Sequence, residues 1–162
     1  GQYDREMEMG MLDDVFWLLP SGVFNNVGFY SKYFFLYGEQ NDYAIRAVKQ
    51  GYKLIYTPDA KIWHRGSMTT CKGDSNSPKL TFWRTKASLA LLTLHSEKRY
   101  LFNYFFKTFF KKVIIGLPVG IIRRIKGDKK ALKNNLAILF ALIYFISWYM
   151  YKRKDKGFNP FN

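Results

Sequence analysis

Residues 99–113 read RYLFNYFFKTFFKKV, and the fold of the C-terminal half depends on this stretch. Its large apolar side chains recur with the spacing of one helix face, while Lys107, Lys111 and Lys112 fall on the remaining arc. The spacing predicts an amphipathic helix that is apolar on one side and basic on the other. Such a helix either lies on a membrane surface or packs onto the core of its own domain.

Two further apolar runs, at 113–122 and 136–151, continue this half and are bracketed by lysines and arginines. The second run has 16 residues, fewer than the roughly 20 needed to cross a bilayer. It ends in Trp148, Tyr149 and Tyr151, and aromatic residues followed by basic ones are typical of a membrane interface. We therefore expect membrane contact, and both a true span and helices lying in the membrane plane stay open.

The charges are distributed unevenly along the chain. Residues 1–60 carry five Lys/Arg and eight Asp/Glu, whereas residues 61–162 carry 21 and four, and the net charge is +14. A strongly basic half indicates a polyanionic partner. Because its aromatic residues form continuous faces instead of alternating singly with Lys and Arg, we expect an anionic membrane surface and no nucleic acid.

The remaining composition limits the chemistry and the organisation. A single cysteine, Cys71, excludes an intrachain disulfide and a cysteine metal cluster. Residues 66–78 are rich in Ser, Thr, Gly, Asn and Lys, which predicts a boundary between a first part, 1–78, and a basic helical part, 79–162. The chain opens on Gly1 without a signal peptide, so we expect a processed chain or a piece of a longer one.

The first part shows an alternation of extended and helical patterns. Residues 15–19, VFWLL, predict a buried strand, and 41–50 predict a short helix that ends before Gly51. Residues 53–57 and 61–64 predict two further extended segments. This order favours an α/β fold for the first part, followed by amphipathic, membrane-associated α-helices.

Residues 34–64, FFLYGEQNDYAIRAVKQGYKLIYTPDAKIWH, place Glu39 and Asp42 directly behind an apolar, aromatic run. A carboxylate against apolar surroundings must be paired, hydrogen-bonded or used in chemistry, since burying an unpaired charge is costly. One interpretation is that both carboxylates merely stabilise the helix dipole, by about 0.3–1 kcal/mol. Taken alone, His64 is equally consistent with a structural hydrogen bond.

The segment 23–64 resembles the C-terminal part of the catalytic domain of family 2 glycosyltransferases, in particular the bacterial rhamnosyltransferase-like members. The resemblance is carried, in order and spacing, by Phe34-Phe35, Glu39 with Asp42, Arg46, Gly51-Tyr52 and His64. It implies part of a GT-A fold and an inverting transfer of a sugar such as rhamnose from a nucleotide-sugar donor. The implied acceptor is a cell-surface glycan or a lipid-linked one, at the cytoplasmic face of the bacterial inner membrane.

The resemblance also implies roles for individual residues. A sugar hydroxyl needs a carboxylate to take its proton as it attacks, and the family's usual base is the Asp that follows the Glu. Here that position is Gln40, so the catalytic carboxylate is Glu39 or Asp42, with Arg46 able to pair with Asp42. Further implied residues are Phe35, Tyr37, Gln40 and Arg46 for substrate binding, and His64 as a ligand of a divalent metal, Mg or Mn.

The donor-binding half of such an enzyme, with its Asp-x-Asp motif, should precede this segment, and residues 1–14 do not contain it. We therefore expect the isolated chain to be inactive. The competing hypothesis is a non-catalytic membrane-binding module derived from a glycosyltransferase, in which Gln40 marks a decayed site.

Overall fold

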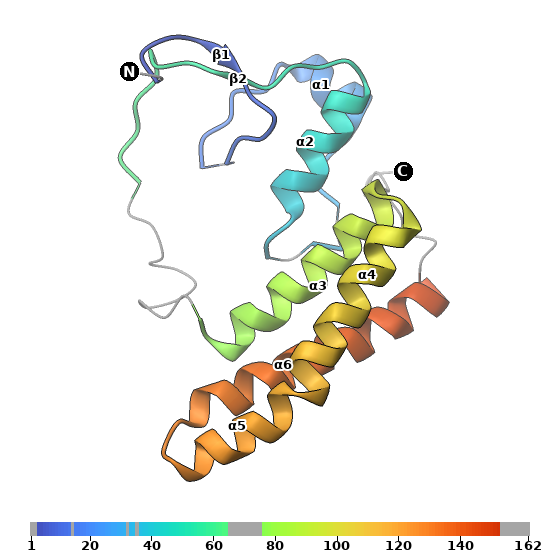
Figure 1. The fold of residues 1–162 in the computed structure, drawn as a ribbon. Helices are drawn as coiled ribbons and strands as arrows, with labels where there is room; N and C mark the ends of the chain where they lie inside the picture. Colours follow the sequence, from blue (N-terminus) through green and yellow to red (C-terminus); the bar gives the residue numbers. More distant parts are fainter. Residues whose placement is uncertain (1–2, 14, 32, 35, 65–75, 153–162) are drawn as a thin grey trace.

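The computed structural model describes residues 3–13, 15–31, 33–34, 36–64 and 76–152. Of residues 151 and 152 it describes the backbone alone. Its elements are β1 (Met7–Glu8), α1 (Ser21–Val27), α2 (Glu39–Lys49), β2 (Ile55–Tyr56), α3 (Pro78–His95), α4 (Lys98–Thr108), the π-helix η1 (Phe109–Ile114), α5 (Gly116–Ile125), α6 (Lys129–Ser147) and the π-helix η2 (Trp148–Lys152). In Figure 1 the small N-terminal part lies at one end of the molecule, and the long helices form the other end.

The fold is mainly helical, and the prediction of an α/β fragment of a GT-A domain is wrong. Helix accounts for 63% of the structure. Its sheet, within the described residues, is a two-stranded antiparallel ribbon in which Met7 pairs with Tyr56 and Glu8 with Ile55. Strands this short, without further neighbours, are only marginally stable by themselves, so the sheet cannot organise the core.

Two predicted strands are absent from the positions expected for them. Residues 15–19 are irregular, with Leu18 89% exposed. Only Trp17 and Leu19 of this run pack onto the small cluster formed by α1 and α2. Residues 61–64 are likewise irregular and exposed. No neighbouring strand of the described chain pairs with either segment. The aromatic residues that suggested strands therefore do not lie in a sheet.

The predicted helices are confirmed. The helix expected at 41–50 is α2, and Gly51, with φ of 88°, follows it in the left-handed conformation that glycine accommodates. The amphipathic stretch 99–113 is helical, as α4 continuing into η1. At the start of α6, the Asp128 carboxylate accepts hydrogen bonds from the backbone N–H groups of Lys130 and Ala131, as an N-cap residue does.

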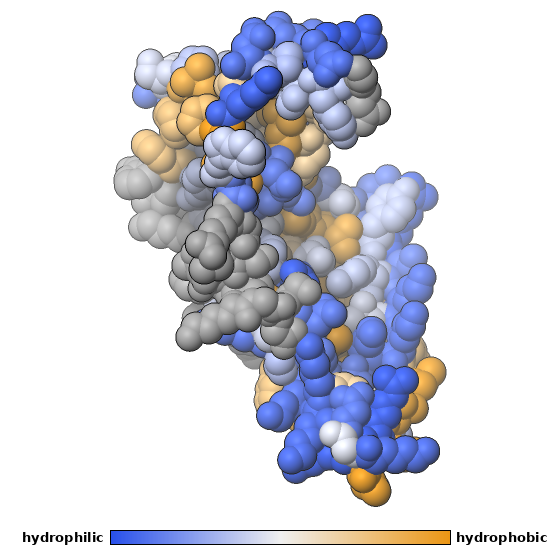
Figure 2. Space-filling view, turned by 90° about the vertical axis from the view of Figure 1, so that its left-hand side faces the viewer, coloured by the Kyte–Doolittle hydropathy of each residue, from blue (hydrophilic) through white to orange (hydrophobic). Residues whose placement is uncertain are grey.

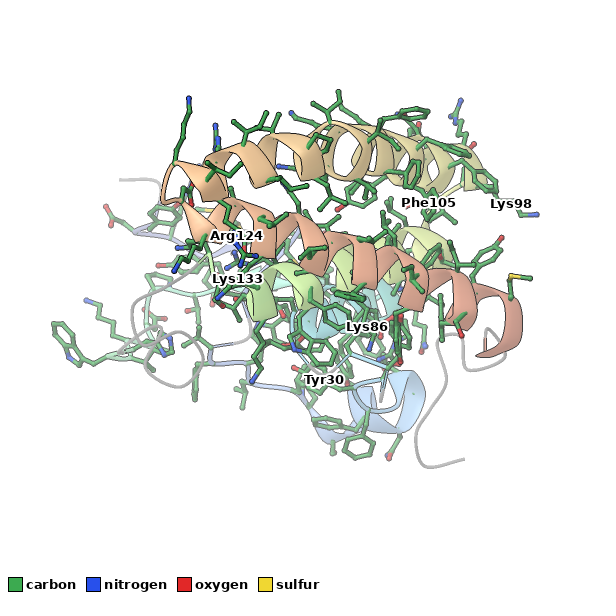
Figure 3. All side chains as sticks on the ribbon, turned by 90° about the horizontal axis from the view of Figure 1, so that it is seen from below. Tyr30, Lys86, Lys98, Phe105, Arg124 and Lys133 are labelled. Atoms are coloured by element: carbon green, nitrogen blue, oxygen red, sulfur yellow. The ribbon has the colours of Figure 1, made fainter. Side chains whose placement is uncertain are left out.

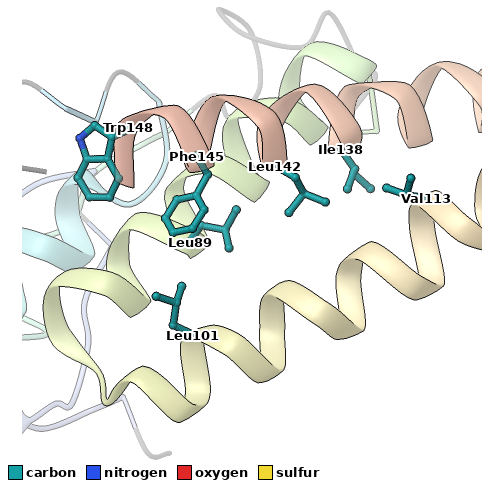
Figure 4. Packing of buried hydrophobic residues seen from close by; sticks show 7 residues of the cluster. All are labelled: Leu89, Leu101, Val113, Ile138, Leu142, Phe145 and Trp148. Carbon is teal, nitrogen blue, oxygen red and sulfur yellow. The ribbon is translucent and has the colours of Figure 1, made fainter. Parts of the chain in front are cut away.

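The long helices are arranged in layers. In Figure 3, α4, η1 and α5 form one layer, α3 and α6 lie beside it, and the N-terminal part lies beyond them. The main core, shown in Figure 4, fills the space between α3, α4, η1 and α6. Its buried members are Leu89, Leu101, Val113, Ile138, Leu142, Phe145 and Trp148. Removing apolar surface from water contributes about 25 cal/mol per Å², so the burial of these side chains is the main force that holds the helices together.

The crossing of α5 and α6 is especially close. A Cβ atom on Gly120 would lie 2.9 Å from the Cα atom of Leu132, and the Asn135 side chain donates a hydrogen bond to the Gly116 carbonyl.

The predicted boundary at residue 78 falls at the first residue of α3, whose N-cap is Ser77. Helix α2 packs against α3, so the two parts of the chain are in contact.

Candidate functional site

The acidic motif is positioned by a tight bend before α2. Tyr37 has φ of 65° and Gly38 has φ of 89°, two successive residues in the left-handed region. Gly38 is also required for space, since a Cβ atom there would lie 2.9 Å from the Phe34 ring. The bend makes Glu39 the first residue of α2. There its half-buried side chain has one buried oxygen, Oε2, and lies at the helix end that favours negative charge.

Asp42 is in a different environment from Glu39. It is fully buried, and Arg46 Nε donates to its Oδ2 at 2.9 Å, as the i,i+4 spacing predicted. The Arg46 guanidinium also donates to the backbone carbonyls of Val27 and Phe29, which ties α2 to the end of α1. A carboxylate held in this way supports the fold and is poorly placed to meet a substrate hydroxyl.

His95, at the end of α3, completes this polar network. Its Nε2 lies 2.8 Å from Asp42 Oδ1, and its Nδ1 lies 3.4 Å from Lys49 Nζ. The network therefore joins α2 to α3 across 53 positions of sequence. Sequence reasoning missed His95, because a single histidine before Ser96 carries no local pattern, and its partner is reached only through the tertiary fold.

The predicted substrate-binding residues are only partly available to a ligand. The Tyr37 hydroxyl accepts a hydrogen bond from Arg84, whose guanidinium lies 4.7 Å from the centre of the Tyr37 ring. The adjacent hollow, lined by Tyr33, Phe34 and Trp83 among others, has no room for a water molecule. Gln40 is half-buried beside Glu39, and Phe35 lies outside the described residues. Their binding role stays a prediction.

The predicted metal ligand, His64, is an exposed residue at the end of the irregular segment 61–64. Within the part of the chain that the structure describes, no group of three or more His, Cys, Asp or Glu side chains is placed to hold a metal ion. These residues alone do not fit a Mg²⁺ or Mn²⁺ site, which needs several oxygen ligands. Cys71 lies outside the described residues.

Lys86 on α3 is enclosed by aromatic rings. Its ammonium donates a hydrogen bond to the Tyr33 carbonyl and lies 4.3 Å from the centre of the Tyr33 ring, with Trp83 and Tyr144 both at 4.8 Å. Burial lowers the pKa of Lys86, and burial together with the nearby Tyr144 phenol raises the pKa of Tyr33. These contacts, which we call the Lys86 cage, join α3, α6 and the segment before α2.

The outer side of α4, η1 and α6 is an exposed apolar surface, which we call the apolar face. On α4 and η1 it is formed by Phe102, Phe106, Phe110 and Ile114, each about half exposed and four residues apart. On α6 and η2 it continues with Ile146 and Met150, which are also exposed. A fully apolar groove of about 230 Å³ joins the two stripes between Phe106 and Ile146. Contiguous exposed apolar surface is a feature shared by many interaction sites.

Basic residues surround this helical part. Figure 2 shows hydrophilic side chains covering its lower end, with apolar ones protruding at the edge and tip. In Figure 3, Arg124 of α5 and Lys133 of α6 lie together at one end of the helical part. Lys98, the first residue of α4, lies at the other end. Between α3 and α4 a second groove, which we call the lysine groove, has a volume of about 300 Å³. Its lining is Thr85, Tyr104, Lys107, Thr108, Lys111, Lys112 and Ile138.

Among the residues that the structure describes, one helical segment, Lys129–Met150, is long and apolar enough to cross a membrane, with 22 residues. It is longer than the apolar run of 16 residues, because α6 begins at the lysines before that run. The segment also packs inside the molecule, and 39% of its most apolar window is buried. Length and composition alone therefore do not distinguish a span from a core helix.

No family model, curated protein or solved structure matches this chain. The resemblance to glycosyltransferases therefore rests on the spacing of its motif residues alone.

Proposed function

We propose that the chain docks onto an anionic membrane surface through the apolar face of α4, η1 and α6. The observation that carries this proposal is the regular exposure of Phe102, Phe106, Phe110 and Ile114. On the same helices, Lys107, Lys111 and Lys112 form no ion pair with any described acidic side chain. Burying a phenylalanine in the acyl boundary contributes about 1.5–3 kcal/mol. Attraction to an anionic leaflet adds about 1 kcal/mol for each nearby Lys or Arg.

The docked helices lie in the membrane plane. Lys107, Lys111 and Lys112 share the lysine groove with Ile138, which is close to the middle of the segment Lys129–Met150. If α6 crossed the bilayer in this arrangement, these lysines would be near its centre, at a cost of about 2.5–3.5 kcal/mol each. In the plane, the apolar face reaches the acyl chains while the lysines stay at headgroup level. The cytoplasmic face of a bacterial inner membrane fits this charge.

Replacing Phe106 and Phe110 by Asp tests the docking. The double variant F106D/F110D should bind vesicles of phosphatidylcholine and phosphatidylglycerol at least about tenfold more weakly, because two apolar contacts are lost and two negative charges are added. The matched control is F16D/L18D, which changes exposed apolar residues of the N-terminal part. Cosedimentation with vesicles measures both. Equal binding by F106D/F110D and the unchanged chain would contradict the proposal.

A second function, sugar transfer, is supported by the environment of Glu39 and by the motif resemblance. A half-buried carboxylate at the start of α2, behind an aromatic segment, can accept the proton of a sugar hydroxyl as it attacks the anomeric carbon. The nucleoside diphosphate then leaves with inversion. In this function the donor is a nucleotide sugar, and the acceptor is a lipid-linked or cell-surface glycan.

Substitution in the natural gene tests this second function. Glu39→Gln should lower sugar incorporation into cell-surface glycan by at least about tenfold, since an amide cannot act as the base. The matched control is Glu8→Gln, which removes an exposed carboxylate whose oxygen lies 2.9 Å from Lys53 Nζ. Immunoblotting for the chain separates loss of transfer from loss of protein. Full incorporation with Glu39→Gln would remove Glu39 from the chemistry.

A further inference from the structure

We propose that the lysine groove binds the phosphodiester headgroup of one anionic phospholipid. This inference rests on the proposed docking, and it goes further because it assigns a defined site with a single occupant. The groove lies between α3 and α4, and Ile138 of α6 contributes to its lining. Its volume of about 300 Å³ is within the range of sites that hold small molecules.

The charge of the groove is uncompensated. Between residues 98 and 152 the sequence contains one acidic residue, Asp128, and that carboxylate caps the start of α6. No ion pair of Lys107, Lys111 or Lys112 occurs within the described residues. Three lysines that line one groove without a counter-ion favour an anion there, and hydrogen bonds from Lys to phosphate are assisted by charge.

The hydroxyl groups of the groove suit the rest of a polar headgroup. Thr85 Oγ1 donates its proton to the Thr81 carbonyl at 2.9 Å, so the Thr85 oxygen keeps its capacity to accept. It can therefore accept a hydrogen bond from a headgroup hydroxyl. Tyr104 and Thr108 supply further hydroxyl groups. A glycerol headgroup, which carries its own hydroxyls next to the phosphate, matches this set better than choline.

The location of the groove favours a lipid over a free phosphate. Lys107, Lys111 and Lys112 belong to α4 and η1, the helices that also carry the exposed phenylalanines. When these helices lie in the membrane plane, the flexible lysine side chains are within reach of the headgroups. The lysines at 111 and 112 belong to η1, and π-helical turns within helices occur frequently at functional sites. A bound phospholipid would hold its headgroup here while its chains stay in the membrane.

Short-chain lipids, used below the concentration at which they form micelles, test the site without a bilayer. Titration calorimetry with dihexanoylphosphatidylglycerol should show saturable binding of one molecule per chain. Dihexanoylphosphatidylcholine and inorganic phosphate should each bind at least about tenfold more weakly, since one lacks the net charge and the other the glycerol and chains. Phosphate binding as tight as the lipid would overturn a lipid site.

Two matched triple variants test the assignment to this groove. K107Q/K111Q/K112Q should weaken binding of the short-chain phosphatidylglycerol by about tenfold or more, whereas K126Q/K129Q/K130Q removes the same charge elsewhere and should leave it unchanged. All six lysines are exposed, so both variants should fold. Thr85→Val should weaken phosphatidylglycerol more than inorganic phosphate. Equal loss in the two triple variants would mean attraction by net charge alone and would overturn the site.

The site and the docking fail in different ways. If F106D/F110D still binds vesicles but the short-chain lipid needs Lys107, Lys111 and Lys112, the docking is wrong and the site stands. If F106D/F110D no longer binds vesicles, but binding of the short-chain lipid does not depend on the three lysines, the docking stands and the site is wrong.

Discussion

Glu39 and Asp42 are three residues apart on α2, yet their surroundings assign them different tasks. Asp42 has both oxygens engaged by Arg46 and His95, deep in the protein. Glu39 is at the first residue of the helix and only half-buried. The difference arises because Asp42 faces α3, whereas Glu39 follows directly on the bend at Gly38. In the proposed sugar transfer the base is therefore Glu39, whereas Asp42 supports the packing of α2 against α3.

His95→Ala should lower the free energy of unfolding by about 1–3 kcal/mol, because one oxygen of a fully buried carboxylate loses its partner. Lys49→Met is the matched control, since it removes only the contact of an exposed ammonium with Nδ1, the other ring nitrogen of His95. That change should cost within about 0.5 kcal/mol. Urea denaturation measures both, and a His95→Ala chain as stable as the control would show that the network contributes little.

Lys86 gives a prediction about pH. Because burial lowers its pKa in the folded state, the unfolded chain binds more protons between that lowered pKa and the ordinary value of 10.5. Stability from this group therefore rises as the pH rises through that window. Compared with Lys86→Met, the natural chain should gain stability as the pH rises from neutral toward 10.5. Urea titrations of both proteins at each pH measure the difference, and a constant or falling difference would contradict it.

At the scale of the elements, local pattern was sufficient for the helices at 41–50 and 99–113, but not for α1 or for the strands. The helices at 41–50 and 99–113 repeat their apolar residues over several turns, so each specifies its own buried face. The runs at 15–19 and 61–64 are too short to specify a partner strand, and pairing is a tertiary property. The same limit explains why Arg46 with Asp42, four residues apart, was predictable and His95 with Asp42 was not.

Two glycine-to-alanine substitutions should have opposite effects on stability, because only Gly120 lies at the close crossing of α5 and α6. Gly120→Ala should destabilise by about 1–3 kcal/mol, since its Cβ would contact the backbone of Leu132 at 2.9 Å. Gly22→Ala in α1 should be neutral or stabilising by up to about 1 kcal/mol, because its Cβ meets nothing within 4 Å and alanine favours helix. Thermal unfolding measures both. Equal effects would mean that the crossing relaxes easily.

At the scale of the whole molecule, the N-terminal part and the helical part differ in charge as well as in structure. The first 60 residues are mildly acidic, whereas the helices carry most of the Lys and Arg. An anionic surface therefore attracts the helical end and not the N-terminal end. This polarity would orient the molecule with the bend before α2 on the far side of α3 and α6 from the layer of α4, η1 and α5, as Figure 3 shows.

The charge asymmetry predicts a dependence on salt. Raising NaCl from about 0.05 M to about 0.5 M shortens the screening length several-fold and should weaken binding to vesicles rich in phosphatidylglycerol. Binding to pure phosphatidylcholine should change little, because it depends on the apolar face. Cosedimentation at both salt concentrations measures this, and an equal loss on both kinds of vesicle would show that the basic residues do not supply the attraction.

The π-helix η1 carries one residue that an ordinary α-helix would not need. A π-turn holds one residue more than an α-turn, so deleting one residue from Phe109–Ile114 would restore ordinary α-helical hydrogen bonding. The deleted residue is the surplus of the wide turn, so the following α5 would keep about the same side toward α6, and Gly120 would still face Leu132. A single-codon deletion in α4 would instead rotate everything after it by about 100° and change which side of a whole helix faces its neighbour. Of the two deletions, the one within η1 should therefore be the less damaging.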